Sequence, residues 1–117
     1  MKILTLSKLE FEPATSALFT DGVTRAGMFP TGDFNSGLVH FGAGSRNKFH
    51  THTTDQVLII TEGTGVVATD TEECTVTAGD VILIPAGENH WHGAPGATAM
   101  AHITITGKGA QTTQNEP

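Results

Sequence analysis

Short apolar runs separated by glycine, proline and polar turn residues make up most of the chain. No stretch repeats apolar residues at the spacing of an amphipathic helix for more than about two turns. Eight runs are instead four to eight residues long and often rich in β-branched side chains, as expected of strands. They span residues 25–29, 36–41, 55–61, 63–69, 74–77, 80–85, 90–93 and 99–106. This pattern predicts an all-β sandwich or barrel.

Two of these runs alternate regularly enough for their faces to be assigned. In residues 36–41, Val39 and Phe41 share one face, so His40 is expected to point the other way, toward solvent or a subunit contact. In residues 99–106, one face carries the side chains of Met100, His102, Thr104 and Thr106. A strand face of histidine and threonine predicts a polar pocket.

The length of the chain predicts a single domain. A chain of 117 residues can bury one hydrophobic core without disulfides. Residues 1–34 are less regular and are expected to form edge strands and loops of this domain, whereas residues 35–106 hold most of the strand-like runs and are expected to form the barrel. Residues 107–117 are polar, contain glycine and end in proline, so they are expected to form a flexible tail.

The charge of the chain argues against two classes of partner. The net charge is −6 and the six basic residues are scattered, so no basic stripe is present for nucleic acid or an anionic membrane. The apolar runs are too short to cross a bilayer, and polar residues interrupt the apolar start of the chain, so a soluble cytoplasmic protein is expected. Cys74 is the only cysteine, which excludes an intramolecular disulfide and a cysteine-based zinc finger.

Two blocks of the sequence combine glycines and histidines at fixed spacing. The fixed positions of the first block are Gly44, His50, His52, Gln56 and Gly63. Those of the second block are Gly79, Pro85, Gly87 and His90. On an extended strand, two histidines separated by one residue project from the same face, close enough to bind one cation. By itself this spacing is also found by chance in strands, so the first block alone leaves a metal site and an ordinary strand both open.

Both blocks resemble the paired motifs of the cupin superfamily, G(X)5HXH(X)3,4E(X)6G and G(X)5PXG(X)2H(X)3N, and they occur in the same order. The resemblance implies a cupin β-barrel, which is a double-stranded β-helix or jelly roll, with the two motif hairpins facing each other. The metal ligands that it implies are His50, His52, Gln56 and His90. A metal-free barrel that has kept the motif is the alternative.

The chain departs from the cupin pattern at two positions. Gln56 stands where the motif has an acid, and Ala94 stands where it has asparagine. A neutral glutamine leaves a divalent ion with its full charge, so bound water or alcohol should be more acidic, and metal affinity lower, than with glutamate. Because glutamine cannot act as a base, His92 and His102 are the expected catalytic bases. For each of them, a hydrogen-bonded pocket histidine is the alternative.

A narrower resemblance covers residues 38–105. The segments THTTDQVLIIT, HWHGA and TAMAH are similar to a group of small bacterial manganese-containing cupins with hydroxynitrile lyase activity. This resemblance implies Mn as the cofactor, with Fe, Ni, Zn or Cu as alternatives because imidazole binds all of them. It also implies that His92 and His102 act in catalysis. Thr106 stands where that group has a pocket glutamine, and this departure bears on the cyanohydrin reaction.

Three functions are consistent with these residues. The first is a metalloenzyme in which a substrate hydroxyl binds the metal, a histidine takes its proton and a C–C bond breaks, as in a hydroxynitrile lyase. The second is a metal-dependent oxygenase of the dioxygenase type, and the third is a non-catalytic sensor that binds a small ligand at the metal. The expected partner is a small oxygen-containing organic molecule. The resemblance also implies a homodimer or a higher homo-oligomer.

Overall fold

The computed structural model describes residues 1–117 and confirms the predicted all-β architecture. Besides the 3-10 helix η1 (Leu6–Lys8), it contains β1 (Glu12–Pro13), β2 (Val23–Gly27), β3 (Phe34–Phe41), β4 (Ser45–Arg46), β5 (His50–His52), β6 (Gln56–Thr69), β7 (Glu73–Thr77), β8 (Val81–Ile84), β9 (His90–Ala94), β10 (Met100–Gly107) and β11 (Thr112–Gln114). Since the one helix has three residues, the chain has no helical segment that could span a membrane.

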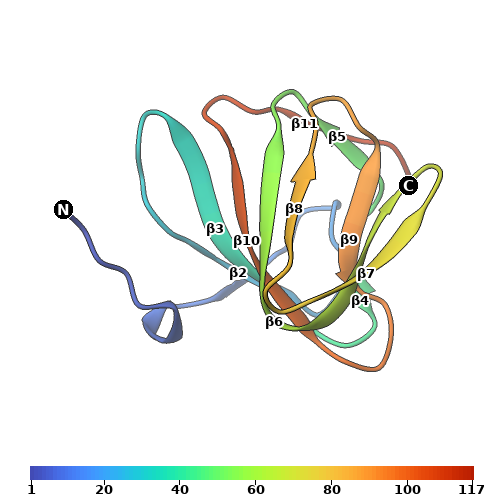
Figure 1. The fold of residues 1–117 in the computed structure, drawn as a ribbon, viewed down its shortest axis with the longest axis horizontal. Coiled ribbons are helices and arrows are strands. Elements are labelled where there is room, and N and C mark those ends of the chain that lie inside the picture. The colour runs from blue at the N-terminus through green and yellow to red at the C-terminus, as the bar shows by residue number, and fades with distance from the viewer.

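The strands form one strongly curled sheet with two facing layers. Its order is β1-β2-β3-β10-β6-β9-β5-β11, with β4 paired to β9, and with β7 and β8 paired to β6. Strand β6 belongs to both layers, because its first half pairs with β8 and β10 and its second half with β7 and β9. Figure 1 shows the layer of β2, β3 and β10 on the left and the layer of β5, β7 and β9 on the right. The two layers make a half-barrel, and their face-to-face arrangement is the one that the predicted jelly roll requires.

Glycine is required where β6 passes from one layer to the other. Gly63 has a φ of +72°, which side chains rarely adopt, and a Cβ at this position would lie 2.0 Å from the carbonyl oxygen of Ala99. The last glycine of the first motif block therefore permits a close approach between β6 and the start of β10.

The interior of the half-barrel is apolar on one side and polar on the other. The apolar core consists of Val23, Val39, Phe41, Leu58, Ile60, Val67, Val76, Ile84, Ala94 and Met100. In β6, Gln56, Leu58 and Ile60 alternate with less buried residues and all point inward. Gln56 thus extends the same inward row as the core residues into the polar half.

The predicted faces of the two alternating runs are confirmed. His102, Thr104 and Thr106 of β10 line the polar cavity. His40 of β3 points the other way, onto the outer face of the sheet, where it lies near Glu62. One histidine of the six is thereby separated from the other five.

Part of the C-terminal segment, for which the sequence predicts a flexible tail over residues 107–117, is paired. Strand β11 lies antiparallel to β5, with Thr112 opposite His52 and Gln114 opposite His50. Main-chain hydrogen bonds hold these residues, including one of 2.8 Å from the Asn115 N–H to the Phe49 carbonyl oxygen. Main-chain pairing leaves no hydrophobic signal in a polar sequence, so composition alone does not predict β11.

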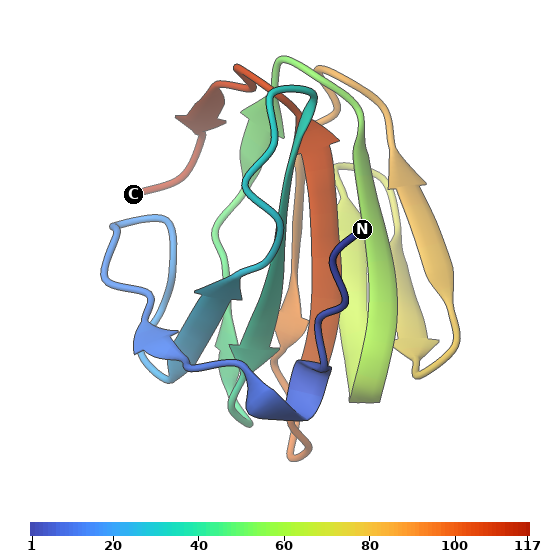
Figure 2. The same ribbon diagram turned by 90° about the vertical axis from the view of Figure 1, so that its left-hand side faces the viewer.

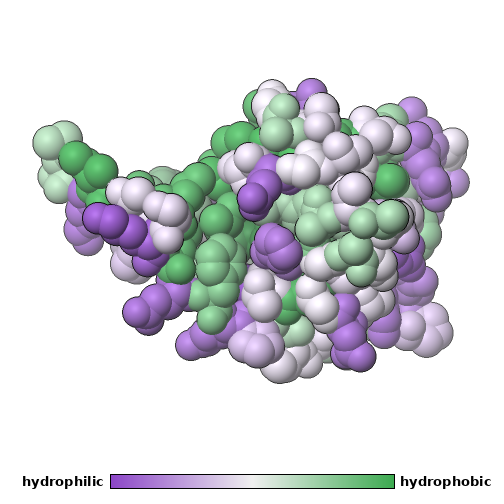
Figure 3. All heavy atoms as spheres, turned by 90° about the horizontal axis from the view of Figure 1, so that it is seen from below, coloured by the Kyte–Doolittle hydropathy of each residue, from purple (hydrophilic) through white to green (hydrophobic).

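The loop between β1 and β2 and the C-terminal segment lie on the same side of the molecule. Figure 2 shows the loop between β1 and β2 (light blue) beside the C-terminal segment (dark red). Residues of this loop and of β11 line the same cavity. Viewed from below, apolar side chains gather along the N-terminal arm, where Met1, Ile3 and Phe11 are exposed, whereas the opposite end is mostly polar (Figure 3).

Candidate metal centre

Three histidines converge at the polar end of the half-barrel. His50 and His52 come from β5 and His90 from β9, and one nitrogen of each lies within 4.8 Å of those of the other two. The register explains the convergence, because His50 pairs directly with His90 across β5 and β9. His52 projects from the same face as His50 since it is two residues further along the strand. The structure thus brings three of the four predicted ligands into one cluster.

The outer nitrogen of each ring is held by a hydrogen-bond partner. His50 Nδ1–H donates to the Lys48 carbonyl oxygen (2.5 Å), and His90 Nδ1–H donates to that of Glu88 (2.8 Å). His52 Nδ1 lies 2.9 Å from the Thr112 hydroxyl of β11. With the proton on Nδ1, His50 and His90 keep a lone pair on Nε2, which is the arrangement found in metal-binding histidines. The Thr112 hydroxyl can accept from Nδ1–H of His52 and so allows the same tautomer there.

Gln56 joins the three histidines. Its Nε2–H donates to Thr104 Oγ1 (2.9 Å), so its Oε1 faces the cluster and lies 3.1 Å from His90 Nε2. Since the proton of His90 is on Nδ1, these two atoms are both acceptors. His52 Nε2 is buried and has no partner. A cation at this point would satisfy all of these lone pairs, so the residues fit a divalent metal, and three imidazoles with an amide oxygen suit Mn, Fe, Ni, Zn and Cu.

His92 and His102 form a second, adjoining pair. His102 Nε2 lies 2.9 Å from His92 Nδ1, so the two rings share one proton. Both side chains are buried, and His92 stacks on His90 with a centroid distance of 5.6 Å. Asn47 fixes His92 by accepting its main-chain N–H at Oδ1 (2.8 Å). The two residues predicted as bases thus lie together beside the triad and outside it.

Burial keeps these five histidines neutral. Desolvation lowers the pKa of His50 to about 3 and that of His102 to about 4. It also lowers the pKa of His52 and His90, and it holds the pKa of His92 well below its ordinary value. Neutral imidazole is the form that binds metal and accepts protons, so the site is ready for both at neutral pH.

Acid is expected to destabilise the metal-free protein between about pH 6.5 and pH 4. In the unfolded chain a histidine has a pKa near 6.5, whereas folded His102 has a pKa of about 4. In this window the unfolded state binds more protons, so the free energy of unfolding falls as the pH falls and recovers as it rises. Urea midpoints measured across the window test this. The H102Q variant should give a shallower slope, and equal slopes for both proteins would contradict the explanation.

The cavity in front of the triad has a volume of about 480 Å³. Its walls come from the loop before β2, from β2, β3 and β10, and from the C-terminal segment. Sequence reasoning missed Asn47, Thr112 and Arg25 as cavity residues. Asn47 precedes His50 by three residues and is a buried polar residue, but nothing in the pattern distinguishes it from a turn residue. Thr112 lines the cavity only because β11 pairs with β5.

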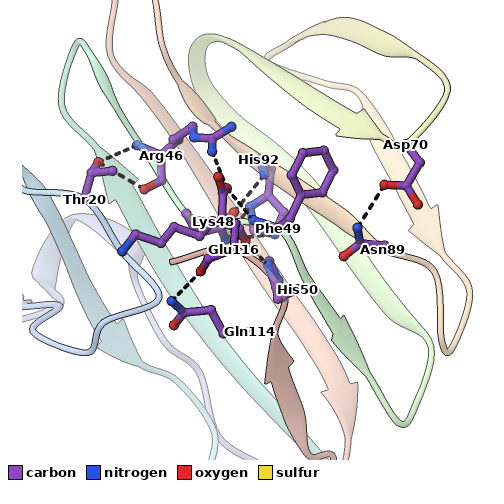
Figure 4. A network of polar contacts seen from close by, with 11 residues as sticks. Thr20, Arg46, Lys48, Phe49, His50, Asp70, Asn89, His92, Gln114 and Glu116 are labelled. Atoms are coloured by element: carbon purple, nitrogen blue, oxygen red, sulfur yellow. Dashed lines mark hydrogen bonds and ion pairs between the residues drawn. The ribbon is translucent and has the colours of Figure 1, made fainter.

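The C-terminal segment also braces the start of β5. Glu116 accepts the Phe49 N–H (2.8 Å) and pairs with Arg46, as the dashed lines in Figure 4 show. The Arg46 guanidinium in turn lies 4.4 Å from the centre of the Trp91 ring. Together with the Thr112 contact to His52, this network fixes the strand that carries two of the three histidines.

Comparison with known proteins agrees with this geometry. A family model described as a cupin domain matches residues 37–106. The (R)-mandelonitrile lyase of Granulicella tundricola is 43% identical over 70 residues, which cover 57% of this chain and 52% of the lyase. A gentisate 1,2-dioxygenase from a Ralstonia species is 46% identical over 57 residues, which cover 48% of this chain and 16% of the dioxygenase. The chain therefore spans about half of the lyase and a smaller part of the dioxygenase.

A solved structure shares most of the fold. The crystal structure of a cupin-like protein from Thermotoga maritima superposes with a TM-score of 0.79 at 27% identity, and the match covers 88% of this chain and 84% of that chain. The predicted jelly-roll architecture is confirmed by this likeness.

Proposed function

The chain belongs to the cupin domain family, and from that membership we propose that it is a metal-dependent lyase of the hydroxynitrile lyase type. Its substrate is a small α-hydroxy compound, and its reaction breaks the C–C bond next to the hydroxyl. The observation that carries the proposal is the His92–His102 pair, two buried neutral imidazoles that share a proton beside the triad. Similarity to a mandelonitrile lyase over 70 residues supports it.

His50, His52, His90 and Gln56 would hold the ion, which we propose to be manganese as the sequence resemblance implies. A divalent ion at this place supplies a Lewis acid that polarises the substrate oxygen. The neutrality of all four ligand side chains supports strong polarisation, since no carboxylate offsets the charge of the ion.

The two buried histidines accept the proton of the substrate hydroxyl and later return it. His102 takes the proton of the substrate hydroxyl while the C–C electron pair leaves with the carbanion, for which cyanide is the model, and the C–O bond becomes a carbonyl. The pair then returns one proton to the carbanion, so that aldehyde and hydrogen cyanide are released and the histidines are regenerated. The 2.9 Å contact lets either ring hold the proton in between, and Asn47 keeps His92 in place.

Release of benzaldehyde from mandelonitrile by the manganese-loaded protein tests this function. A rate well above that of the H50A variant is expected, because that variant lacks one nitrogen of the triad. Equal rates for the two proteins would exclude the lyase.

A dioxygenase is the second candidate, favoured by similarity to a gentisate 1,2-dioxygenase over 57 residues. Imidazole donors also accept iron, which such chemistry uses. Oxygen uptake by the iron-loaded protein with catechols and diketones separates the two functions, because a lyase consumes no oxygen.

A further inference from the structure

The cavity differs in charge from the rest of the protein. The chain has twelve Asp and Glu residues and a net charge of −6. None of these acids lines the cavity, whose side chains are apolar, neutral polar or histidine with a single exception. That exception is Arg25 of β2. The cavity therefore holds one fixed positive charge and no fixed negative charge.

Arg25 stands in the same inward row as the reacting histidines. It pairs with Val39 of β3, and Val39 pairs with His102 of β10. Paired residues of neighbouring strands point to the same face, so all three point into the half-barrel. Two strand spacings separate the Cα atoms of Arg25 and His102 by roughly 10 Å. The Arg25 side chain is exposed at the edge of the fold, and it lines the same cavity as His102.

The guanidinium group of Arg25 has no partner within the chain. The single ion pair of the protein is between Arg46 and Glu116. Glu12 lies opposite Arg25 in the pairing of β1 with β2, and both residues line a depression beside the cavity, but they form no ion pair. Arg25 makes no side-chain hydrogen bond either, so its N–H groups are available to a ligand.

We propose that the substrate carries a carboxylate apart from its reacting hydroxyl, and that Arg25 binds this carboxylate. The proposal rests on the function proposed above, since it names the substrate class of the same cavity. The planar guanidinium offers two parallel N–H groups that match a carboxylate. Gln56 and the three histidines contribute no negative charge, so a divalent ion in the triad would keep its full positive charge. An anionic substrate would supply the compensating negative charge.

Binding measurements test the proposal without relying on turnover. The probes are 3-hydroxypropanoate, 5-hydroxypentanoate and 4-(hydroxymethyl)benzoate, each compared with its primary amide, which has the same shape and no charge. Calorimetric titrations of the metal-loaded and the metal-free protein should show that at least one carboxylate binds more tightly than its amide. In R25Q that preference should fall about tenfold, since a charge-assisted hydrogen-bonded pair is lost.

Two further variants control for net charge and for folding. K8Q removes one exposed positive charge outside the cavity and should keep the preference. R25K should keep part of it, because charge remains without the planar fork. The proposal is overturned if no carboxylate is preferred to its amide, or if R25Q and the unchanged protein show the same preference. Carboxylate binding in a protein without lyase activity would instead contradict only the proposed reaction.

Discussion

Replacing His50 with alanine is expected to abolish stoichiometric metal binding. His50 supplies one of the three nitrogens of the triad, pairs directly with His90, and is held in its metal-binding tautomer by the Lys48 carbonyl. Loss of a partner outside the ligand shell costs roughly 10- to 100-fold in metal affinity, and loss of a ligand exceeds this. Elemental analysis after loading with Mn, Fe, Ni, Zn or Cu gives the measurement.

Three comparison variants show which contact is responsible. H40A removes an imidazole from the outer face and should leave the metal content unchanged. T112V removes only the hydroxyl beside His52 Nδ1 and should weaken binding by about 10- to 100-fold. Q56E should strengthen binding, because a carboxylate neutralises part of the charge of the ion. Full metal occupancy in H50A would contradict the assignment of the site. The absence of metal from the unchanged protein under all loading conditions would contradict it as well.

Local sequence patterns predicted the parts of this site that depend on spacing alone. The HxH spacing places His50 and His52 on one face of β5, and the alternation of residues 99–106 turns His102 and Thr104 inward. The motif glycines mark backbone that other residues cannot adopt, as Gly63 shows. Such features are fixed by the geometry of one strand or turn, so they can be predicted without the rest of the fold.

Other parts of the site depend on pairing between distant segments. Thr112 reaches His52 because β11 pairs with β5, and Arg25 lines the cavity because β2 pairs with β3. Asn47 contacts His92 although 45 residues separate them. A single sequence carries no local signal for such contacts, since polar residues at strand ends look alike whether they face solvent or a cavity.

The H102Q variant is expected to lose about 10²- to 10⁴-fold in kcat for cyanohydrin cleavage, the range typical of a missing general base. Its metal content should not change, since His102 lies outside the triad. Glutamine keeps a hydrogen-bonding group of similar size but cannot accept a proton from the substrate. Rates of benzaldehyde release and elemental analysis of the same samples give the two readouts, and H40Q is the matched control on the outer face.

The double variant H92Q/H102Q then distinguishes a shared role from two separate ones. Because the two rings lie 2.9 Å apart and share a proton, they should act as a unit, and the double variant should be about as slow as the slower single variant. Multiplicative losses would mean that each histidine acts independently. Unchanged kcat in H102Q would contradict the role of His102 as a base. His102 would then be a buried histidine that only supports His92, and the proton acceptor would have to lie elsewhere in the cavity.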